Sequence, residues 1–262
     1  MNNRKENLEA FNRLLDILDE LREKCPWDKA QTNESLRANT IEETYELSEA
    51  ILSNNQDEIK KELGDLLLHV IFYAKIGEEK NAFDIGDVCN AISDKLTFRH
   101  PHVFGDSSIE SAELVEKSWE QIKMKEKNGN DMILDGVPKL LPSLIKAFRI
   151  QDKARNSGFD WNIRRDVWDK VNEEMGELKA EIDKMNKDRM EAEFGDLLFS
   201  IVNASRLYQI NPDNALERTN RKFIKRFNYL EKKAKQSNRN LKDMTLAEME
   251  EIWQEAKKED VE

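Results

Sequence analysis

The 262-residue sequence contains few of the residues that interrupt helices or cross-link a chain. Its nine Gly and five Pro are too few for the many tight turns of an all-β or loop-rich protein. It has only two Cys, Cys25 and Cys89, and no Cys-x-x-Cys spacing, which argues against a disulfide framework or a cysteine-ligated metal site. We expect both to be free thiols in a reducing compartment.

Long hydrophobic runs are also missing. The longest apolar run, residues 66–74, includes a His and is too short to span a bilayer. The first residues are polar and charged, so no signal peptide is expected. These absences predict a cytoplasmic protein that has no membrane partner.

Positive charge is in the minority. Lys and Arg number 42 against 53 Asp and Glu, which gives a net charge of −11 and an isoelectric point near 5.1. A chain of this balance is not expected to bind a nucleic-acid polymer. A small anionic substrate is still compatible, because a local cluster of cations can override the mean charge.

The 36% charged and 39% hydrophobic content, with few helix breakers, indicates long amphipathic helices. Apolar spacing predicts helices over residues 6–23, 33–52, 57–76, 84–98, 110–127, 167–184, 190–207, 214–235 and 246–258. Loops are expected at 25–28 and 99–106. No stretch shows sustained β alternation, so we predict an all-α chain. Segment 128–143, which contains Gly and Pro, is the expected linker between an N-terminal domain, 1–127, and a C-terminal domain, 144–262.

One acidic pattern occurs twice. Glu-Glu-x-x-Glu at 42–46 is followed by Glu-x-x-Asp at 62–65, and each position recurs 131 residues later. Residues three apart share a helix face, and the two parts of each copy are symmetric about position 54 or 185, in an expected turn. An antiparallel helix hairpin would therefore bring four carboxylates to one level in each half. These are Glu43, Glu46, Glu62 and Asp65 in the first half, and Glu174, Glu177, Glu193 and Asp196 in the second.

Four crowded carboxylates repel one another unless a cation lies between them. A set of oxygen ligands suits Mg²⁺, with Mn²⁺ as the alternative. A di-iron bundle is disfavoured, because it requires Glu-x-x-His on its helices. A solvated acidic surface would explain one copy, whereas two copies with identical spacing favour metal sites.

The second copy has more positive charge around it. At the 131-residue offset, Lys170 and Arg189 replace a neutral residue and an acid of the first copy. Lys222 and Arg226 lie four residues apart on a later helix and so share a face. Trp253 is available for packing or for stacking on a base. A polyphosphate is therefore expected to bind the second half better.

Together these motifs resemble the MazG family of nucleoside triphosphate pyrophosphohydrolases in its two-domain bacterial form. The resemblance covers nearly the whole chain and includes Cys-Pro-Trp-Asp at 25–28, Arg-His-Pro-His-Val-Phe-Gly at 99–105 and Gly-Phe-Asp-Trp at 158–161. It implies an all-α homodimer built from a tandem repeat. It also implies Mg²⁺-dependent conversion of a nucleoside triphosphate and water to a monophosphate and diphosphate, with the C-terminal half as the competent one.

The resemblance also implies roles for individual residues. The residues that would hold Mg²⁺ are Glu174, Glu177, Glu193 and Asp196. The residues that would contact the nucleotide are Lys170, Glu173, Arg189, Lys222 and Arg226, with Trp253 against the base. The residues of a second candidate metal site are Glu43, Glu46, Glu62 and Asp65.

The mechanism we expect is metal-assisted attack of water on the α-phosphorus, with Glu177 or Glu174 orienting or deprotonating the water. Lys170, Lys222 and Arg226 would stabilise the charge on the leaving diphosphate. The sequence has no Gly-rich phosphate loop ending in Gly-Lys-Ser/Thr, which disfavours a kinase-like transfer. We expect a broad range of ribo- and deoxyribonucleotides. A narrower dNTP pyrophosphatase and a non-catalytic helical scaffold are the alternatives.

Overall fold

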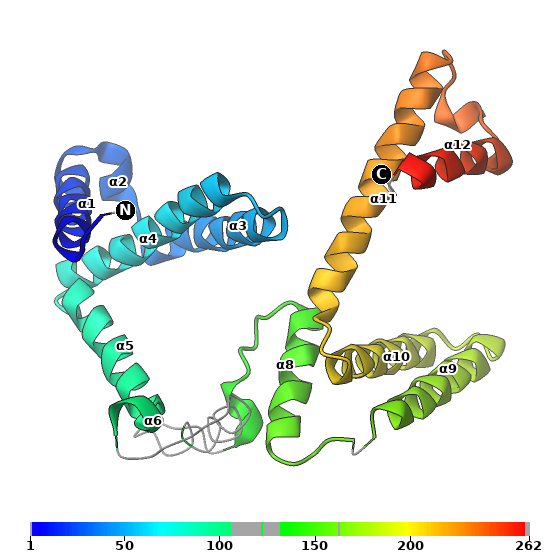
Figure 1. Cartoon of the computed structure of the whole chain (residues 1–262), viewed down its shortest axis with the longest axis horizontal. Helices are drawn as coiled ribbons and strands as arrows, with labels where there is room; N and C mark the ends of the chain where they lie inside the picture. Colours follow the sequence, from blue (N-terminus) through cyan, green and yellow to red (C-terminus); the bar gives the residue numbers. More distant parts are fainter. Residues whose placement is uncertain (1, 106–121, 123–131, 162, 260–262) are drawn as a thin grey trace. The chain divides into compact units, whose positions relative to one another are not determined.

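The computed structural model describes residues 2–105, 122, 132–161 and 163–259. It divides the chain into two compact units, Met1–Ile109 and Glu110–Glu262. Within the described residues every regular element is a helix, which confirms the all-α prediction (Figure 1). The helix expected at 110–127 and part of the expected linker at 128–143 lie outside the described residues, so the domain boundary stays a prediction.

The first unit is built on an antiparallel hairpin of two long helices, packed against a third. Its helices are α1 (Arg4–Lys24), α2 (Pro26–Ala30), α3 (Asn33–Leu52), α4 (Gln56–Glu79), α5 (Ile85–Arg99) and α6 (Pro101–Phe104). The loops expected at 25–28 and 99–106 were wrong in part, because they contain the short helices α2 and α6. Each of these begins at a Pro, whose missing N–H is no loss in the first turn of a helix.

The core of the first unit lies where α1, α3 and α4 meet. Its buried members are Leu18, Leu36, Ile71, Phe72 and Ile76. Their spacing along each helix gives one apolar face, and burial of that face is the main stabilising contribution.

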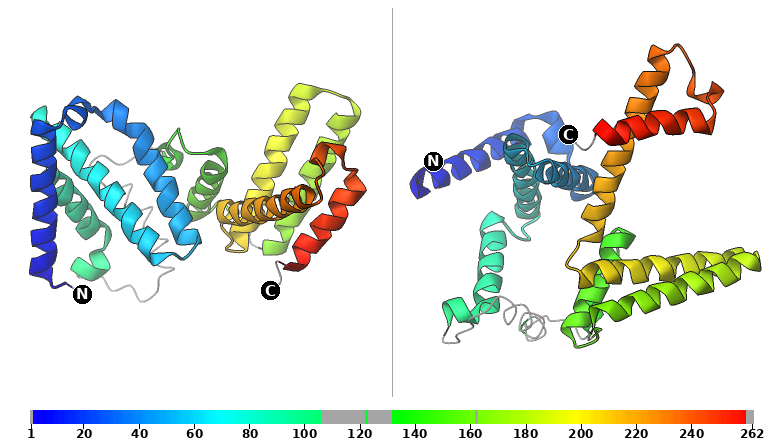
Figure 2. Two further views of the ribbon diagram at one scale, coloured as in Figure 1. Left: turned by 90° about the horizontal axis from the view of Figure 1, so that it is seen from above. Right: turned by 45° about the vertical axis from the view of Figure 1, so that its right-hand side comes forward.

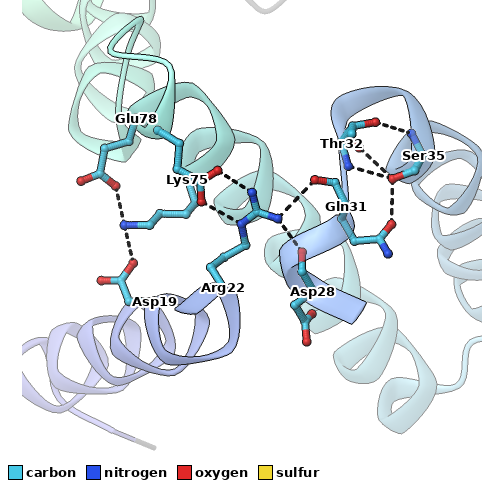
Figure 3. Close-up of polar contacts among 9 residues, drawn as sticks. Asp19, Arg22, Asp28, Gln31, Thr32, Ser35, Lys75 and Glu78 are labelled. Carbon is cyan, nitrogen blue, oxygen red and sulfur yellow. Dashed lines mark hydrogen bonds and ion pairs between the residues drawn. The ribbon is translucent and has the colours of Figure 1, made fainter. Parts of the chain in front are cut away.

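Arg22 ties the end of α1 to two other segments (Figure 3). Its guanidinium donates hydrogen bonds to the backbone carbonyls of Asp28 and Gln31 and to the carboxylate of Glu79 at the end of α4. The side chain of Arg22 is only 9% exposed. The hydrogen bond from Arg22 also lowers the pKa of Glu79. The buried cation of Arg22 therefore holds together α1, α4 and the turn that follows α2.

The second unit repeats the hairpin and adds further helices. Its elements are η1 (Ile133–Gly136), α8 (Ser143–Asn156), η2 (Arg164–Asp166), α9 (Val167–Asp183), α10 (Lys187–Leu207), α11 (Pro212–Gln236), η3 (Leu241–Asp243) and α12 (Leu246–Glu259). Helix α8 packs on α10 and α11, and α12 packs on α11 (Figure 2). The sequence pattern did not predict α8, because residues 151–156 are mostly polar although Gln151 and Lys153 are buried.

The two hairpins turn at matching positions. Asn54 joins α3 to α4 with a φ of 53°, and Met185, which is 131 residues later, joins α9 to α10 with a φ of 55°. Both hairpins appear as antiparallel pairs in Figures 1 and 2. The predicted symmetry about positions 54 and 185 is therefore present, and it brings the acids of paired helices face to face. None of the described helices combines the length and apolar character that crossing a membrane requires.

Candidate active site

The hairpin of the second unit assembles a group of three carboxylates. Oxygens of Glu174 and Glu177 on α9 and of Glu193 on α10 all lie within 4.8 Å of one another. Glu174 is buried, Glu193 is half-buried and Glu177 is exposed. The fourth predicted acid, Asp196, lies outside this tight group but lines the adjoining pocket.

The electrostatics of this group indicate a need for a cation. Burial raises the pKa of Glu193, and the negative charges of Glu177, Asp196 and Glu174 raise it further. Oxygen Oε2 of Glu193 is buried without a hydrogen-bond partner. A carboxylate in this setting must take up a proton or meet a positive charge. The all-oxygen donor set fits a hard divalent cation such as Mg²⁺.

Lys170 lies beside the carboxylates, one turn before Glu174 on α9. Its Nζ is 2.7 Å from Oε1 of Glu174 and 3.1 Å from Oε1 of Glu173. Hydrogen bonds to these two acids raise the pKa of Lys170, so it carries its charge at neutral pH. The guanidinium of Arg189, at the start of α10, lies 3.9 Å from Oε1 of Glu181.

A pocket of about 660 Å³ adjoins the carboxylates. Its charged lining residues are Asp160, Lys170, Glu174, Asp196 and Arg206. Its apolar part is formed by Leu134, Ile150, Ala154, Phe159, Trp161, Val167 and Phe199. The pocket thus combines charged and apolar lining residues. The Gly-Phe-Asp-Trp motif at 158–161 was the sequence signal for part of the pocket lining. The lining residues that α8 supplies were not predicted from the sequence.

An ion pair anchors that motif to α10. The guanidinium of Arg206 donates to Asp160 at 3.1 Å, and also to Oδ1 of Asn203 at 2.8 Å and 3.1 Å. Burial alone would raise the pKa of Asp160, but the hydrogen bonds from Arg206 and from the Trp161 N–H outweigh it and lower the pKa. The pocket wall is therefore held by an ion pair whose arginine is buried.

Three residues that were expected at the nucleotide lie elsewhere in the second unit. Lys222 and Arg226 belong to α11, and Trp253 belongs to α12. The Arg226 guanidinium lies 6.0 Å from the centre of the Trp253 ring, and Trp253 also packs against Phe223 at 5.0 Å. As far as the described residues go, neither the carboxylate group nor the pocket lining includes these three side chains.

The first unit holds a matching carboxylate group. Oxygens of Glu43, Glu62 and Asp65 lie within 4.8 Å of one another. Burial raises the pKa of Glu43, and the charges of Asp65, Glu46 and Glu62 raise it further. Oxygen Oε2 of Glu62 is buried without a hydrogen-bond partner, as is the same atom of Glu193 at the matching position. Both donor sets therefore fit a divalent cation.

The pocket beside the first group, of about 590 Å³, is strongly acidic. Its charged lining residues are Lys61, Glu42, Glu46, Glu49, Glu58 and Glu62. The Nζ of Lys61 already lies 2.8 Å from Glu62. A triphosphate would therefore meet mostly negative charge there, in line with the charge difference between the halves that the sequence predicted.

Bulky side chains also fill the first unit where the second has its pocket. His69 and Phe72 occupy the positions that Ser200 and Asn203 hold 131 residues later. Both are buried, and His69 is hydrogen-bonded to Oγ1 of Thr40 at 2.7 Å. Burial lowers the pKa of His69, which favours a neutral, packed histidine.

Comparison with known proteins agrees with this doubled architecture. The MazG nucleotide pyrophosphohydrolase domain matches residues 31–104 and again residues 166–230. The nucleoside triphosphate pyrophosphohydrolase of Escherichia coli (strain K12) is 41% identical over 261 residues, covering 97% of this chain and 99% of that protein. The nucleoside triphosphate pyrophosphohydrolase/pyrophosphatase MazG of Thermotoga maritima is 44% identical over 250 residues, covering 94% and 95%.

A third relative, the uncharacterized protein YabN of Bacillus subtilis (strain 168), is 46% identical over 251 residues, which cover 94% of this chain but 51% of that protein. The two domain matches contain both acidic hairpins, and the first two relatives align over almost their full length. The chain therefore belongs to the MazG family of nucleotide pyrophosphohydrolases.

Proposed function

We propose that the second unit hydrolyses nucleoside triphosphates to monophosphates and diphosphate, with Mg²⁺ and over a broad range of ribo- and deoxyribonucleotides. The observation that carries the proposal is the pocket in which Lys170, Glu174 and Asp196 adjoin an apolar body. A nucleotide has the same division between charged phosphates and an apolar base. The names of the relatives from Escherichia coli and Thermotoga maritima support the reaction class.

The residues we expect to hold Mg²⁺, or Mn²⁺ in its place, are Glu174, Glu177, Glu193 and Asp196. When bound, such a cation neutralises phosphate charge and makes water more acidic. The buried oxygen of Glu193 without a partner and the raised pKa of Glu193 are the features that this cation would relieve.

The protein's own residues would orient the substrate and accept a proton. The base would lie in the apolar part of the pocket, and Lys170 would contact the phosphates. Water forms a new bond to the α-phosphorus. The bond between the α-phosphorus and the oxygen that bridges it to the β-phosphate breaks, and diphosphate leaves. Glu177 is the better proton acceptor, because Glu174 is paired with Lys170 at 2.7 Å.

A second copy of the chain would complete the site. One face of α10 exposes Phe194, Leu198 and Ile201 at helical spacing. An apolar face of this kind is typical of a surface that another protein chain buries. We include in the proposal a homodimer in which Lys222, Arg226 and Trp253 of one copy reach the triphosphate held by the other. This arrangement would explain why the described lining of the pocket does not include these three side chains.

Product analysis tests the proposed function. ATP, followed by a panel of NTPs and dNTPs, is incubated with Mg²⁺ or with EDTA, and products are separated by ion exchange. We expect AMP and diphosphate, formed only with Mg²⁺. The Glu177→Gln variant should lose about a thousandfold in rate, whereas the matched Glu46→Gln variant should keep wild-type activity.

Other outcomes would change the assignment. ADP and phosphate would contradict attack on the α-phosphorus. Loss of activity in Glu46→Gln alone would move the site to the first unit. Turnover restricted to a few dNTPs would favour the narrower pyrophosphatase, and no turnover of any nucleotide would favour the helical scaffold.

A further inference from the structure

Gln151 of α8 is a buried amide at the pocket, and only one side of it is hydrogen-bonded. The residue is 6% exposed and lines the pocket beside Phe199. Its Nε2 donates to the backbone carbonyl of Phe199 at 2.8 Å. A carbonyl oxygen can only accept, so this bond determines which end of the amide is NH₂. The Oε1 end is buried and has no hydrogen-bond partner.

The fold itself does not require an amide at this position. When the Asp-x-x-Arg stretches of α1 and α8 are aligned, Gln151 matches Leu18 of the first unit. Leu18 is 1% exposed and belongs to the apolar core. A buried acceptor without a partner destabilises a fold, whereas Leu at the same place stabilises it. The amide therefore has a use that packing does not supply.

Several other polar groups of the pocket lining already have partners. Oδ1 of Asn203 accepts from Arg206, and the hydroxyl of Ser200 donates to the carbonyl of Leu197. Lys170 is paired with acids. The lining residues next to Gln151 on α8 are Ile150 and Ala154, which are apolar. We therefore expect its Oε1 to meet the base of a nucleotide rather than its phosphates.

We propose that Gln151 selects the base: its Oε1 accepts a hydrogen bond from an exocyclic amino group of the nucleobase. The inference rests on the proposed function and narrows it, since adenine, cytosine and guanine carry such a group and uracil and thymine do not. A substrate without the donor would leave the buried oxygen unpaired in the complex. Sites of this kind discriminate strongly against the analogue that lacks the donor.

The test compares ATP with purine riboside triphosphate, which differs from ATP only in lacking the amino group. We expect wild-type kcat/KM to favour ATP by about tenfold or more. In Gln151→Leu the ratio should fall close to one, because the rate with ATP drops while the rate with the analogue is kept. Ser200→Ala, whose hydroxyl is bonded within the helix, is the control that should keep the wild-type ratio.

The outcomes separate this inference from the proposed function. A wild-type ratio near one, or an unchanged ratio in Gln151→Leu, overturns the role of Gln151 while leaving hydrolysis intact. If no triphosphate is hydrolysed, the proposed function fails, and equilibrium binding of the two nucleotides to wild type and Gln151→Leu still tests base selection through the same ratio.

The unfolding temperature of Gln151 variants distinguishes a role of Gln151 in base selection from a role in stabilising the fold. We expect Gln151→Leu to unfold at about the wild-type temperature, because removal of the unpaired buried oxygen offsets loss of the hydrogen bond to the Phe199 carbonyl. The Gln151→Met variant, which is unbranched and also lacks the acceptor, should give the same loss of discrimination if Leu does not fit. A folded Met variant that still prefers ATP tenfold would overturn the inference.

Discussion

Among single residues, the contact between Lys170 and Glu174 has the most direct consequence for the site. The lysine lies 2.7 Å from a carboxylate that we expect to bind Mg²⁺. Ammonium and metal would compete for that carboxylate, so arrival of the cation would release Lys170 for contact with the phosphates. In the first unit the matching position is Asn39, and Lys61 pairs with Glu62 instead.

Replacement of Lys170 should strengthen the binding of the metal ion and weaken the binding of ATP. We expect Lys170→Gln to bind Mn²⁺ about threefold more tightly without nucleotide, because no ammonium competes for Glu174. The same variant should raise KM for ATP about tenfold, because a charge-assisted contact is lost. Titration calorimetry and initial rates measure the two effects. Lys61→Gln is the matched control with unchanged KM, and weaker Mn²⁺ binding in Lys170→Gln would contradict the competition.

The raised pKa of Glu193 predicts how pH affects stabilisation by Mg²⁺. The folded value lies above the ordinary value of 4.5, so this group favours the folded state below that pH and loses the contribution as pH rises through the folded pKa. The metal-free protein is therefore strained by charge at neutral pH. We expect Mg²⁺ to raise the unfolding temperature more at pH 7.5 than at pH 5, measured by circular dichroism. Glu193→Gln should show a smaller difference, and an equal shift at both pH values would argue against this account.

At the scale of helices, short-range polar links hold elements that hydrophobic contacts alone would leave loose. Arg22 binds two backbone carbonyls and Glu79, so it connects three segments of the first unit (Figure 3). In the second unit, Arg206 of α10 donates a hydrogen bond to Asp160 and so holds the pocket wall against α10. Both arginine side chains are almost fully buried.

Removal of the first link should destabilise the fold measurably. We expect Arg22→Met to lower the free energy of unfolding by about 2 kcal/mol, because two carbonyls and a carboxylate lose a donor. Urea unfolding followed by circular dichroism gives the value. Lys24→Met, on the same turn of α1, removes only an exposed pair with Glu20 and should change stability by less than about 0.5 kcal/mol. Equal effects of both changes would show that Arg22 adds nothing beyond surface charge.

For the whole molecule, the absence of Lys222, Arg226 and Trp253 from the described pocket lining leads us to expect a site shared between two copies. If Glu177 and Arg226 act across a dimer, mixed dimers of Glu177→Gln and Arg226→Ala contain one intact site and one doubly altered site. Random mixing then restores about a quarter of wild-type activity. The measurement is the rate after the two variants are unfolded and refolded together, with light scattering to confirm a dimer.

The control pairs two changes from the same carboxylate group. Glu177→Gln mixed with Glu193→Gln should recover nothing, because every site in every dimer then lacks one acid. No recovery for Glu177→Gln with Arg226→Ala in a confirmed dimer would mean that α11 serves its own chain. A monomer by light scattering would remove the shared site altogether.

Local pattern was enough to predict most of the long helices and the repeat of the hairpin. The spacing of apolar residues predicted α1, α3, α4, α9, α10, α11 and α12 closely, because a helix buries one face at a period set by its own geometry. The constant offset of 131 residues predicted two hairpins, and their turns lie at Asn54 and Met185. The extra positive charge of Lys170 beside the acids of the second unit was also predicted, because Lys170 aligns with Asn39 at this offset.

Only the tertiary structure decided which half combines its acids with a largely apolar pocket wall. Gln151, Asp160 and Phe199 are distant in the sequence, and they form one pocket because α8 packs on α10. In the first unit His69 and Phe72 fill the matching space. Periodicity reports which face of a helix is apolar, but whether that face meets a side chain or an open pocket depends on the volume of residues that another segment supplies.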